Sequence, residues 1–469
     1  MSPQDGQQII KTRDDPIPVI LDRTDVPQDT NKPFKLPANM TCSWAKAGEE
    51  FGPEKLRPRI EPWLTALVQS EHLSLLVGSG LTQAVHGLAT DRALPGMRAK
   101  EFQTLQAEIA AEAKRAAKAA GRDSGNFEDE IRAVNELLRG LEIIASTKTE
   151  DAPERKQIDR LRQELNEALR SFAASILEAE RNLASAPGEK REKAFNYLVS
   201  FVMSFASRSG TRDRLHLFTT NYDRYIEAGA DIAGLRLIDR FVGTLAPVFR
   251  ASRLDVDMHY NPPGIRGEPR YLEGVARFTK LHGSIDWVDC DQAIRRFGLP
   301  FGAKDINPYL RAPGLEGAEA MKLMIYPNAA KDRETAEYPY VELFRDFAAA
   351  ICRPNSTLVT YGYSFGDEHI NRVMEDMLTI PSAHLVIISY SDPLGRIMHF
   401  YKRLGRPAQL TLLLGDHLGD LKALVDHYLP KPAIDRTTFR MAELLRKRFG
   451  GQVPQDQDGD STDIGGQSL

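Results

Sequence analysis

Cysteine is scarce in this sequence, with three residues among 469: Cys42, Cys290 and Cys352. Three scattered cysteines, with no CxxC pair, exclude a disulfide framework and a four-cysteine zinc site, and we expect no metal site of any kind. No apolar run approaches the roughly 18 residues that a membrane span needs. The N-terminus has neither the apolar segment of a signal peptide nor the acid-poor character of a transit peptide. We therefore expect a cytoplasmic protein without a membrane partner.

An excess of charge of one sign is also missing. The formal net charge is -4 and the pI is near 6.3, so there is no basic footprint for direct nucleic-acid binding. There is no GxxxxGK[ST] motif, which excludes a standard P-loop. What is present is an ordinary soluble composition, 42% hydrophobic and 27% charged, which can bury one large core or two smaller ones.

The most informative stretch is LSLLVGSGLT, Leu73 to Thr82. Its apolar run predicts a buried parallel strand that leads into a tight turn, where Gly78 and Gly80 let the backbone approach a ligand closely. Backbone N–H groups at such a turn, at the start of a helix, favour an anion such as a phosphate. The turn departs from the dinucleotide fingerprint, because Gln83 stands where the third glycine is expected.

Composition divides the rest of the chain. Residues 1–52 are rich in Pro, Asp, Gln and Lys, and we expect an arm that is disordered or drapes over a neighbour. The main domain is expected at 53–429. Within it, 98–205 has helical spacing and predicts a long helical insertion, while 243–310 is rich in Pro, Gly and Arg and predicts a small irregular module. Residues 430–469 are expected to form a helix and a disordered tail.

After the insertion, apolar strand-like runs alternate with helical ones, which predicts an α/β fold with a doubly wound, Rossmann-like parallel sheet. The candidate strands are Leu215–Thr219, Lys322–Tyr326, Thr357–Tyr361, His384–Ser389 and Gln409–Leu414. The candidate helices between and after them are Val341–Cys352, His369–Leu378 and Leu418–Tyr428. Ligands of such sheets bind at the carboxyl ends of the strands.

Three further motifs follow strand-like runs: TTNYD, LHG within FTKLHGSIDW, and GYSF-D-HIN within TLVTYGYSFGDEHIN. In this order after GSGLT, they resemble the sirtuin family, and more narrowly the sirtuin-like proteins of bacterial anti-phage defence. The resemblance implies the sirtuin fold and NAD+ as the bound substrate. One segment departs from the family, because nothing like SGIPDFR follows the first glycine loop. The resemblance therefore does not predict the geometry of the nicotinamide pocket.

The resemblance also assigns roles to residues. Asn221 and His282 correspond to the catalytic asparagine and histidine, and an imidazole can accept a proton at cellular pH. The expected NAD-binding residues are Gly78, Ser79, Gly80, Thr82, Thr219, Thr220, Asp223, Gly362, Ser364, Asp367, Ser389, Tyr390 and Asp416. Of these, Asp367 is expected on the adenosine side, the ribose is expected near Ser389, and the adenine is expected to face Asp416.

Three functions fit these motifs. Without the four-cysteine zinc module that helps classical sirtuins hold acyl-lysine peptides, water is the expected acceptor, which favours an NAD+ glycohydrolase that releases nicotinamide and ADP-ribose. The alternatives are an NAD-dependent deacylase or ADP-ribosyltransferase, and a non-catalytic NAD or ADP-ribose sensor. A sensor would not need both Asn221 and His282.

The resemblance further implies a role in abortive infection, in which phage triggers NAD+ depletion. The chain has no fused ATPase or Argonaute-like region. The expected activator is therefore a separately encoded partner, first a HerA-type hexameric ATPase and second an Argonaute protein. The helical insertion has more apolar positions than a free-standing hairpin hides, so we expect it to support a homo-oligomer or partner docking.

Overall fold

The computed structural model describes residues 6–12, 14–24, 33–94, 102–119, 122–150, 152–208, 212–252, 256–260, 270–290, 293–315, 318, 323 and 338–431. The candidate strand at 322–326 lies outside the described residues except for Leu323, which forms one bridge to Val288. The C-terminal helix and tail expected at 430–469 also lie outside them, apart from residues 430 and 431. None of the helices in the described part is long and apolar enough to cross a membrane.

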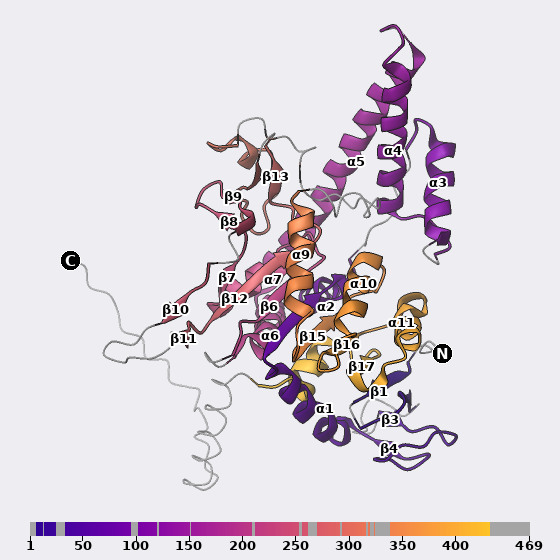
Figure 1. The fold of residues 1–469 in the computed structure, drawn as a ribbon, viewed down its shortest axis with the longest axis vertical. Helices are drawn as coiled ribbons and strands as arrows, with labels where there is room; N and C mark the ends of the chain where they lie inside the picture. The colour runs from indigo at the N-terminus through magenta and orange to yellow at the C-terminus, as the bar shows by residue number, and fades with distance from the viewer. Residues whose placement is uncertain are drawn as a thin grey trace, which may run out of the picture. The chain divides into compact units, whose positions relative to one another are not determined.

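A parallel sheet forms the centre of the fold, as the alternation of strands and helices predicts (Figure 1). Its seven parallel strands, in spatial order, are β17 (Leu410–Leu414), β16 (His384–Ser389), β15 (Ser356–Tyr361), β5 (His72–Val77), β6 (His216–Thr219), β12 (Val275–Lys280) and β7 (Arg236–Ile238). From β5 the chain adds β6, then β7 at the edge and β12 between them; it then returns to β15 beside β5 and builds outward through β16 and β17 on the other side. The boundary between β5 and β15 is therefore the topological switch point, where doubly wound folds bind ligands.

Helices cover both faces of the sheet because its strands are apolar on both sides. On β5, Leu73, Leu75 and Val77 belong to one hydrophobic cluster, whereas Leu76 belongs to another on the opposite face. The helices packed on the first face are α1 (Pro53–Val68), α2 (Ser79–Thr90), α6 (Gly188–Ala206), α7 (Tyr225–Ala233) and α12 (Leu421–Ala423), with the π-helix η6 (Leu424–Tyr428). Those on the second face are α9 (Tyr340–Ile351), α10 (Glu368–Met377) and α11 (Arg396–Leu404).

The N-terminal segment differs from the disordered or draped arm expected for 1–52. It extends the sheet through four antiparallel strands, β1 (Gln8–Lys11), β2 (Val19–Arg23), β3 (Phe34–Lys35) and β4 (Glu50–Phe51). Strand β1 pairs with β17, and all four of its residues are buried. The sequence gives only a weak signal for β1, because a strand this short becomes stable only with its pairing partner, which lies about 400 positions away.

The helical insertion is present but shorter than 98–205. Helices α3 (Gln106–Ala119), α4 (Phe127–Ala145) and α5 (Pro153–Ala184) pack side by side around their own apolar cluster (Figure 1). Asn126 begins α4 with a capping box to Asp129. Helix α6 belongs instead to the main fold, because its Phe201 and Phe205 lie in the cluster that covers the first face of the sheet.

The region 243–310 also differs from the expected irregular module. It contains β12, a strand of the central sheet, so the LHG motif follows a sheet strand directly. Before and after β12, β8 (Phe241–Val242), β9 (Val248–Phe249), β13 (Trp287–Asp289) and β14 (Ile294–Arg296) make a separate four-stranded sheet. Strands β10 (His259–Tyr260) and β11 (Arg270–Tyr271) pair with each other.

Candidate functional site

The four motif loops leave the sheet from one row. Tyr361 pairs with Val77, Val77 with Thr219, and Thr219 with Lys280, so these four residues lie opposite one another on adjacent parallel strands. Each is the last residue of its strand and is followed directly by a motif loop. Register alone therefore brings together motifs that are up to about 280 positions apart in the sequence.

The first and fourth motifs touch through their backbones at the switch point. Gly78 N donates to Tyr361 O at 3.0 Å, and Gly80 N donates to Gly362 O at 3.1 Å. A Cβ atom on Gly80 would lie 2.6 Å from Gly362 Cα, and Gly362 has φ of +60°, which other residues rarely adopt. The two glycine turns are thus possible only with glycine on both sides.

Helix α2 begins at this contact. Gly78 is its N-cap residue, has extended backbone angles and offers no side chain to cap the first turn. Ser79, the first helical residue, is exposed. In the first turn of α2, Gly80 N donates to Gly362 O and Leu81 N donates to Gly78 O. The N–H group of Ser79, beside a side-chain-free backbone at a helix N-terminus, is the one that fits a phosphate group of NAD+.

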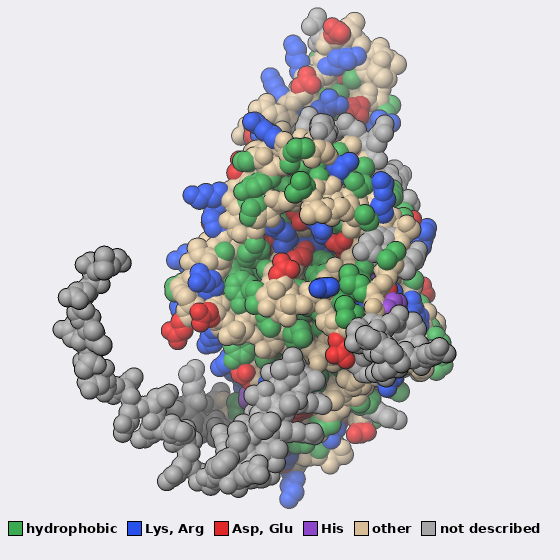
Figure 2. All heavy atoms as spheres, turned by 90° about the vertical axis from the view of Figure 1, so that its left-hand side faces the viewer, with side chains coloured by type: hydrophobic (Ala, Val, Ile, Leu, Met, Phe, Trp, Pro, Cys, Tyr) green, Lys and Arg blue, Asp and Glu red, His purple; other side chains and the backbone are tan. Residues whose placement is uncertain are grey.

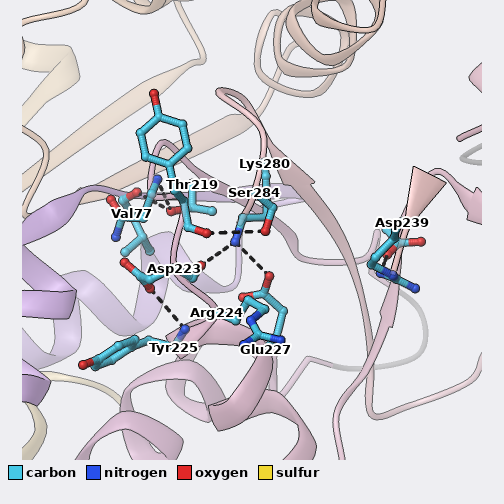
Figure 3. Close-up of polar contacts among 12 residues, drawn as sticks. Val77, Thr219, Asp223, Arg224, Tyr225, Glu227, Asp239, Lys280 and Ser284 are labelled. Atoms are coloured by element: carbon cyan, nitrogen blue, oxygen red, sulfur yellow. Dashed lines mark hydrogen bonds and ion pairs between the residues drawn. The ribbon is translucent and has the colours of Figure 1, made fainter. Parts of the chain in front are cut away.

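The second motif is tied to the first by a chain of hydrogen bonds. Asn221 Nδ2 donates to Gly78 O at 3.0 Å and to Thr82 Oγ1 at 2.9 Å, and Thr82 Oγ1 donates to Asp223 Oδ2 at 2.7 Å. Thr219 Oγ1 donates to Val77 O at 2.9 Å (Figure 3). Both Nδ2 hydrogens of Asn221 are used inside the protein, so in this arrangement its amide nitrogen holds the two loops together.

Thr220 completes this turn through its backbone. Its N–H donates to Val77 O at 3.2 Å, which ties the TTNYD loop to the end of β5. Its side chain is half-buried.

His282 pairs with Asp367 across the third and fourth motifs. Nε2 of His282 lies 2.9 Å from Oδ2 of Asp367, and their side chains are 15% and 4% exposed. Oδ1 of the same carboxylate accepts from His369 N at 3.0 Å and caps α10. With Nε2 donating to a carboxylate, neutral His282 keeps Nδ1 as its free acceptor. Asp367, expected on the adenosine side of NAD+, thus contacts the expected base.

The remaining expected binding residues are less closely connected to this group. Ser389 Oγ donates to Ser391 O at 2.7 Å. Ser364 is exposed, and so is Tyr390 at 58%. Asp416 pairs with Arg23 at 2.8 Å, because the N-terminal strands extend the sheet beside the end of β17. The structure thus gives Asp416 a partner within the protein that the sequence did not indicate.

Two features of the site were missed from the sequence. Phe172 of α5 lies edge-on to Tyr222, with ring centroids 5.8 Å apart, and Tyr222 lies 6.5 Å from the His282 ring. Glu180 of α5 is fully buried and pairs with Arg224, and burial raises the pKa of Glu180 while Arg224 opposes that rise. No local pattern could show that this helix contacts the TTNYD loop.

Lys280 is a further residue that sequence reasoning did not single out, although it lies within the FTKLHG stretch. It is 1% exposed and donates to Asp223 O and to Glu227 Oε1, the latter at 2.9 Å. Figure 3 shows its ammonium group between these two residues. Lys280 therefore joins the second motif to the third.

Residues 215–403 match the SIR2-like domain family. This match supports a sirtuin-like domain and an NAD-related activity, and it includes the second, third and fourth motifs. The first glycine turn lies before the matched residues and is joined to them by the contacts described above. No curated protein matches the chain. Among the described residues, no three His, Cys, Asp or Glu side chains are grouped so that they could hold a metal ion.

Proposed function

We propose that this protein is an NAD+ glycohydrolase, which cleaves NAD+ with water to nicotinamide and ADP-ribose. The observation that carries the proposal is the convergence of an anion-accepting glycine turn, Asn221 and the His282–Asp367 pair at one row of strand ends. The similarity of residues 215–403 to a SIR2-like domain supports NAD+ as the substrate.

Each group of residues has its own role in the cleavage of NAD+. The turn at Gly78 and Gly80 binds the phosphates, which holds the nicotinamide ribose over the loops that follow β6 and β12. When the bond from the anomeric carbon to nicotinamide breaks, its electron pair stays on the ring nitrogen and nicotinamide leaves as a neutral molecule. A water oxygen bonds to the anomeric carbon, and its proton passes to Nδ1 of His282. Asp367 stabilises the imidazolium that results.

Asn221 has two arrangements in this proposal. In the structure its amide nitrogen is bound to Gly78 and Thr82. In the active arrangement, it turns toward the ribose hydroxyls and water. The free protein is therefore of low activity, and a partner that binds the active arrangement more tightly activates it.

We further propose that this control belongs to phage defence. An unregulated cytoplasmic NAD+ hydrolase would harm its own cell, and the insertion contacts the TTNYD loop through Phe172 and Glu180. A separately encoded activator, of HerA type or an Argonaute protein, or self-assembly through the insertion, would act on this contact. The exposed Ile143 and Ile144 of α4 give such a partner an apolar surface.

The decisive experiment is to incubate the purified protein with NAD+, with and without the product of the neighbouring gene, and to quantify nicotinamide and ADP-ribose. We expect equimolar release of both products, which EDTA does not diminish, and a large increase with the activator. His282→Ala is the inactive control. Release of nicotinamide only when an acyl-lysine peptide is supplied would establish a deacylase instead, and binding of NAD+ without any release would establish a sensor.

A cellular experiment tests the defence role separately. Co-expression of the protein with its activator, followed by phage infection, is expected to deplete the cellular NAD+ pool and arrest growth. Cells that carry His282→Ala should keep their NAD+. If wild-type and His282→Ala cells keep equal NAD+ pools after infection, the defence role is wrong even if the purified enzyme is active.

A further inference from the structure

The loops that follow β15, β16 and β17 form the half of the proposed NAD+ site that Asn221 and His282 do not occupy. A dinucleotide carries its pyrophosphate between two nucleosides. With the phosphates at the Gly78 turn and the nicotinamide ribose over the ends of β6 and β12, the adenosine must lie on the other side of that turn. The ends of β15, β16 and β17 form that side, because β5 pairs with β15, β15 with β16 and β16 with β17, all in parallel. These three loops are called the adenosine end below.

Arg396, the first residue of α11, carries a positive charge at the adenosine end. A Cβ atom on Gly366 would lie 2.9 Å from Nη1 of Arg396 and 3.4 Å from Oγ of Ser364, so the guanidinium and the hydroxyl lie beside the same point of the loop after β15. Arg396 is half-buried, whereas Ser364 and Gly366 are exposed. A guanidinium has five N–H donors in a planar arrangement, and together with a neighbouring hydroxyl it suits a phosphate group.

A second arginine, from the helical insertion, lies near the first. Burial and the charge of Arg122 lower the pKa of Arg396 from its ordinary value. Arg122 has the carboxylate of Asp129 as its own partner, at 2.7 Å. An anion bound at Arg396 would relieve the repulsion between the two guanidinium groups and would offset the cost of burying a charge.

Two carboxylates at the adenosine end are engaged within the protein. Asp416 pairs with Arg23 at 2.8 Å and accepts a further hydrogen bond from Gln8. The two oxygens of Asp392 accept backbone N–H groups from the first turn of α11, at 2.8 and 3.1 Å. Many sites that select NAD+ use a carboxylate to bind the 2′-hydroxyl of the adenosine ribose, whereas an arginine at this place accommodates a 2′-phosphate. The adenosine end has the arginine.

The loop between β16 and α11 also offers a surface for the base. The side chains of Tyr390 and Leu394 are 58% and 59% exposed. Aromatic side chains bind nucleic-acid bases by stacking on their faces, and stacking does not depend on which base is present. An exposed ring in the same loop as a guanidinium fits a nucleoside that carries a phosphate.

A cavity of about 690 Å³ between α7 and the small sheet is less suited to such an anion, although arginines line it. Arg240 pairs with Asp346 there, and Arg296 pairs with Asp239. On the face shown in Figure 2, acidic and basic side chains likewise lie next to one another. The local groups at the adenosine end therefore favour a phosphate more than this cavity does.

We propose that the protein also binds and cleaves NADP+, which carries a phosphate on the 2′-oxygen of its adenosine ribose, and that Arg396 and Ser364 bind this phosphate. The inference rests on the proposed NAD+ glycohydrolase function and adds a second substrate to the same site. The bond from the anomeric carbon to nicotinamide breaks, and its electron pair leaves with nicotinamide. Water supplies the oxygen that bonds to the anomeric carbon, and its proton passes to His282. The products are nicotinamide and 2′-phospho-ADP-ribose.

Calorimetry with adenosine 2′,5′-bisphosphate and with AMP tests the adenosine end without any reaction. The two compounds differ only in the 2′-phosphate. Full-length wild-type protein should bind the bisphosphate about tenfold more tightly than AMP, because a guanidinium forms charge-assisted hydrogen bonds with the added phosphate. Equal affinity for the two compounds, weaker binding of the bisphosphate, or binding of neither would overturn the proposal.

Variants locate the phosphate. Arg396→Ala should weaken the bisphosphate about tenfold and leave the affinity for AMP unchanged. Arg403→Ala is the matched control on the same helix, because its side chain is 54% exposed and pairs with Glu375, and it should bind both compounds like wild type. Circular dichroism checks the folding of each variant, and Ser364→Ala, at an exposed position, is the second variant and should also weaken the bisphosphate more than AMP. Equal weakening of both compounds in Arg396→Ala would show that Arg396 binds the 5′-phosphate, and the proposal would fail.

Nicotinamide release from NADP+ and from NAD+, measured with the product of the neighbouring gene present, tests the second substrate. The kcat/KM for NADP+ should lie within about tenfold of that for NAD+, and Arg396→Ala should lower it about tenfold for NADP+ alone. Cleavage of NAD+ without cleavage of NADP+ would overturn this inference and leave the proposed function intact. Arg396-dependent binding of the bisphosphate, with neither dinucleotide cleaved, would instead refute the glycohydrolase function and with it the cleavage of NADP+.

Discussion

Nε2 of His282 and Oδ2 of Asp367 lie 2.9 Å apart although the two residues are 85 positions apart in the sequence. The other oxygen of the same carboxylate caps α10. One side chain therefore fixes both the start of a helix and the orientation of the expected base. Because the helix cap and the imidazole contact use different oxygens of Asp367, a substitution at this residue can remove the contact with His282 and keep the cap.

Asp367→Asn is expected to lower the rate of NAD+ cleavage about 100-fold while it leaves the protein folded. An asparagine oxygen still caps α10, but the amide cannot stabilise an imidazolium. The matched control is Asp420→Asn, which changes the N-cap of α12 and should leave turnover unaltered. An unchanged rate of NAD+ cleavage in Asp367→Asn would mean that the pair is structural only.

His282→Ala and Asn221→Ala should both abolish turnover but differ in stability. The His282 side chain makes one hydrogen bond within the described residues, whereas Asn221 is buried and donates two hydrogen bonds that join two loops. We expect Asn221→Ala to lower the free energy of unfolding by about 1–3 kcal/mol. Thermal melts with nicotinamide assays on the same samples compare the two. Full activity of His282→Ala would refute its assignment as the base.

Gly80→Ala should disrupt the switch point. Its Cβ would lie 2.6 Å from Gly362 Cα, so one of the two glycine turns must shift, and both Tm and NAD+ affinity should fall. Gly87→Ala in the same helix is the control, because nothing lies within 4 Å of its Cβ position. That change should raise stability by about 0.5–1 kcal/mol through helix propensity. Equal melting of the two variants would show that the contact is dispensable.

His417 is expected to make the protein less stable in acid. Burial, His427 and Arg23 lower the pKa of His417 to about 4 from its ordinary 6.5. The unfolded chain binds this proton near pH 6.5 and the folded chain only near pH 4, so the stability is present above pH 6.5 and is lost as the pH falls from 6.5 to 4. Denaturant unfolding across this range should show a shallower loss for His417→Gln. His399→Gln, on an exposed side chain, should behave like wild type.

Phe172→Ala is expected to raise basal NAD+ cleavage in the absence of a partner. The Phe172 ring packs against Tyr222, next to Asn221, and its removal should loosen the arrangement that occupies the Asn221 amide. Phe127→Ala is the matched control, because the Phe127 ring stacks on Phe172, with centroids 4.7 Å apart, on the same insertion. The two variants are compared by nicotinamide release without activator. A lower rate in Phe172→Ala than in Phe127→Ala would show that α5 supports the active arrangement instead.

The sequence by itself determined the parts that depend on local pattern. Apolar runs between helical segments predicted the parallel sheet, with β5, β6, β15, β16 and β17 close to their observed bounds. The glycines of the first turn were recognisable because the backbone there needs residues without a side chain. The four motifs could be placed at strand ends since a strand and the loop that follows it are adjacent in the sequence.

Only the tertiary structure decided which distant groups meet. The pairing of β1 with β17, the contact of Phe172 with Tyr222, and the bond between His282 and Asp367 each join segments far apart in the chain. So does Lys280, whose position between Asp223 and Glu227 depends on the alignment of β12 with β6. The physical reason is that such contacts gain free energy only after the sheet has set its register, and no short stretch of sequence carries that register.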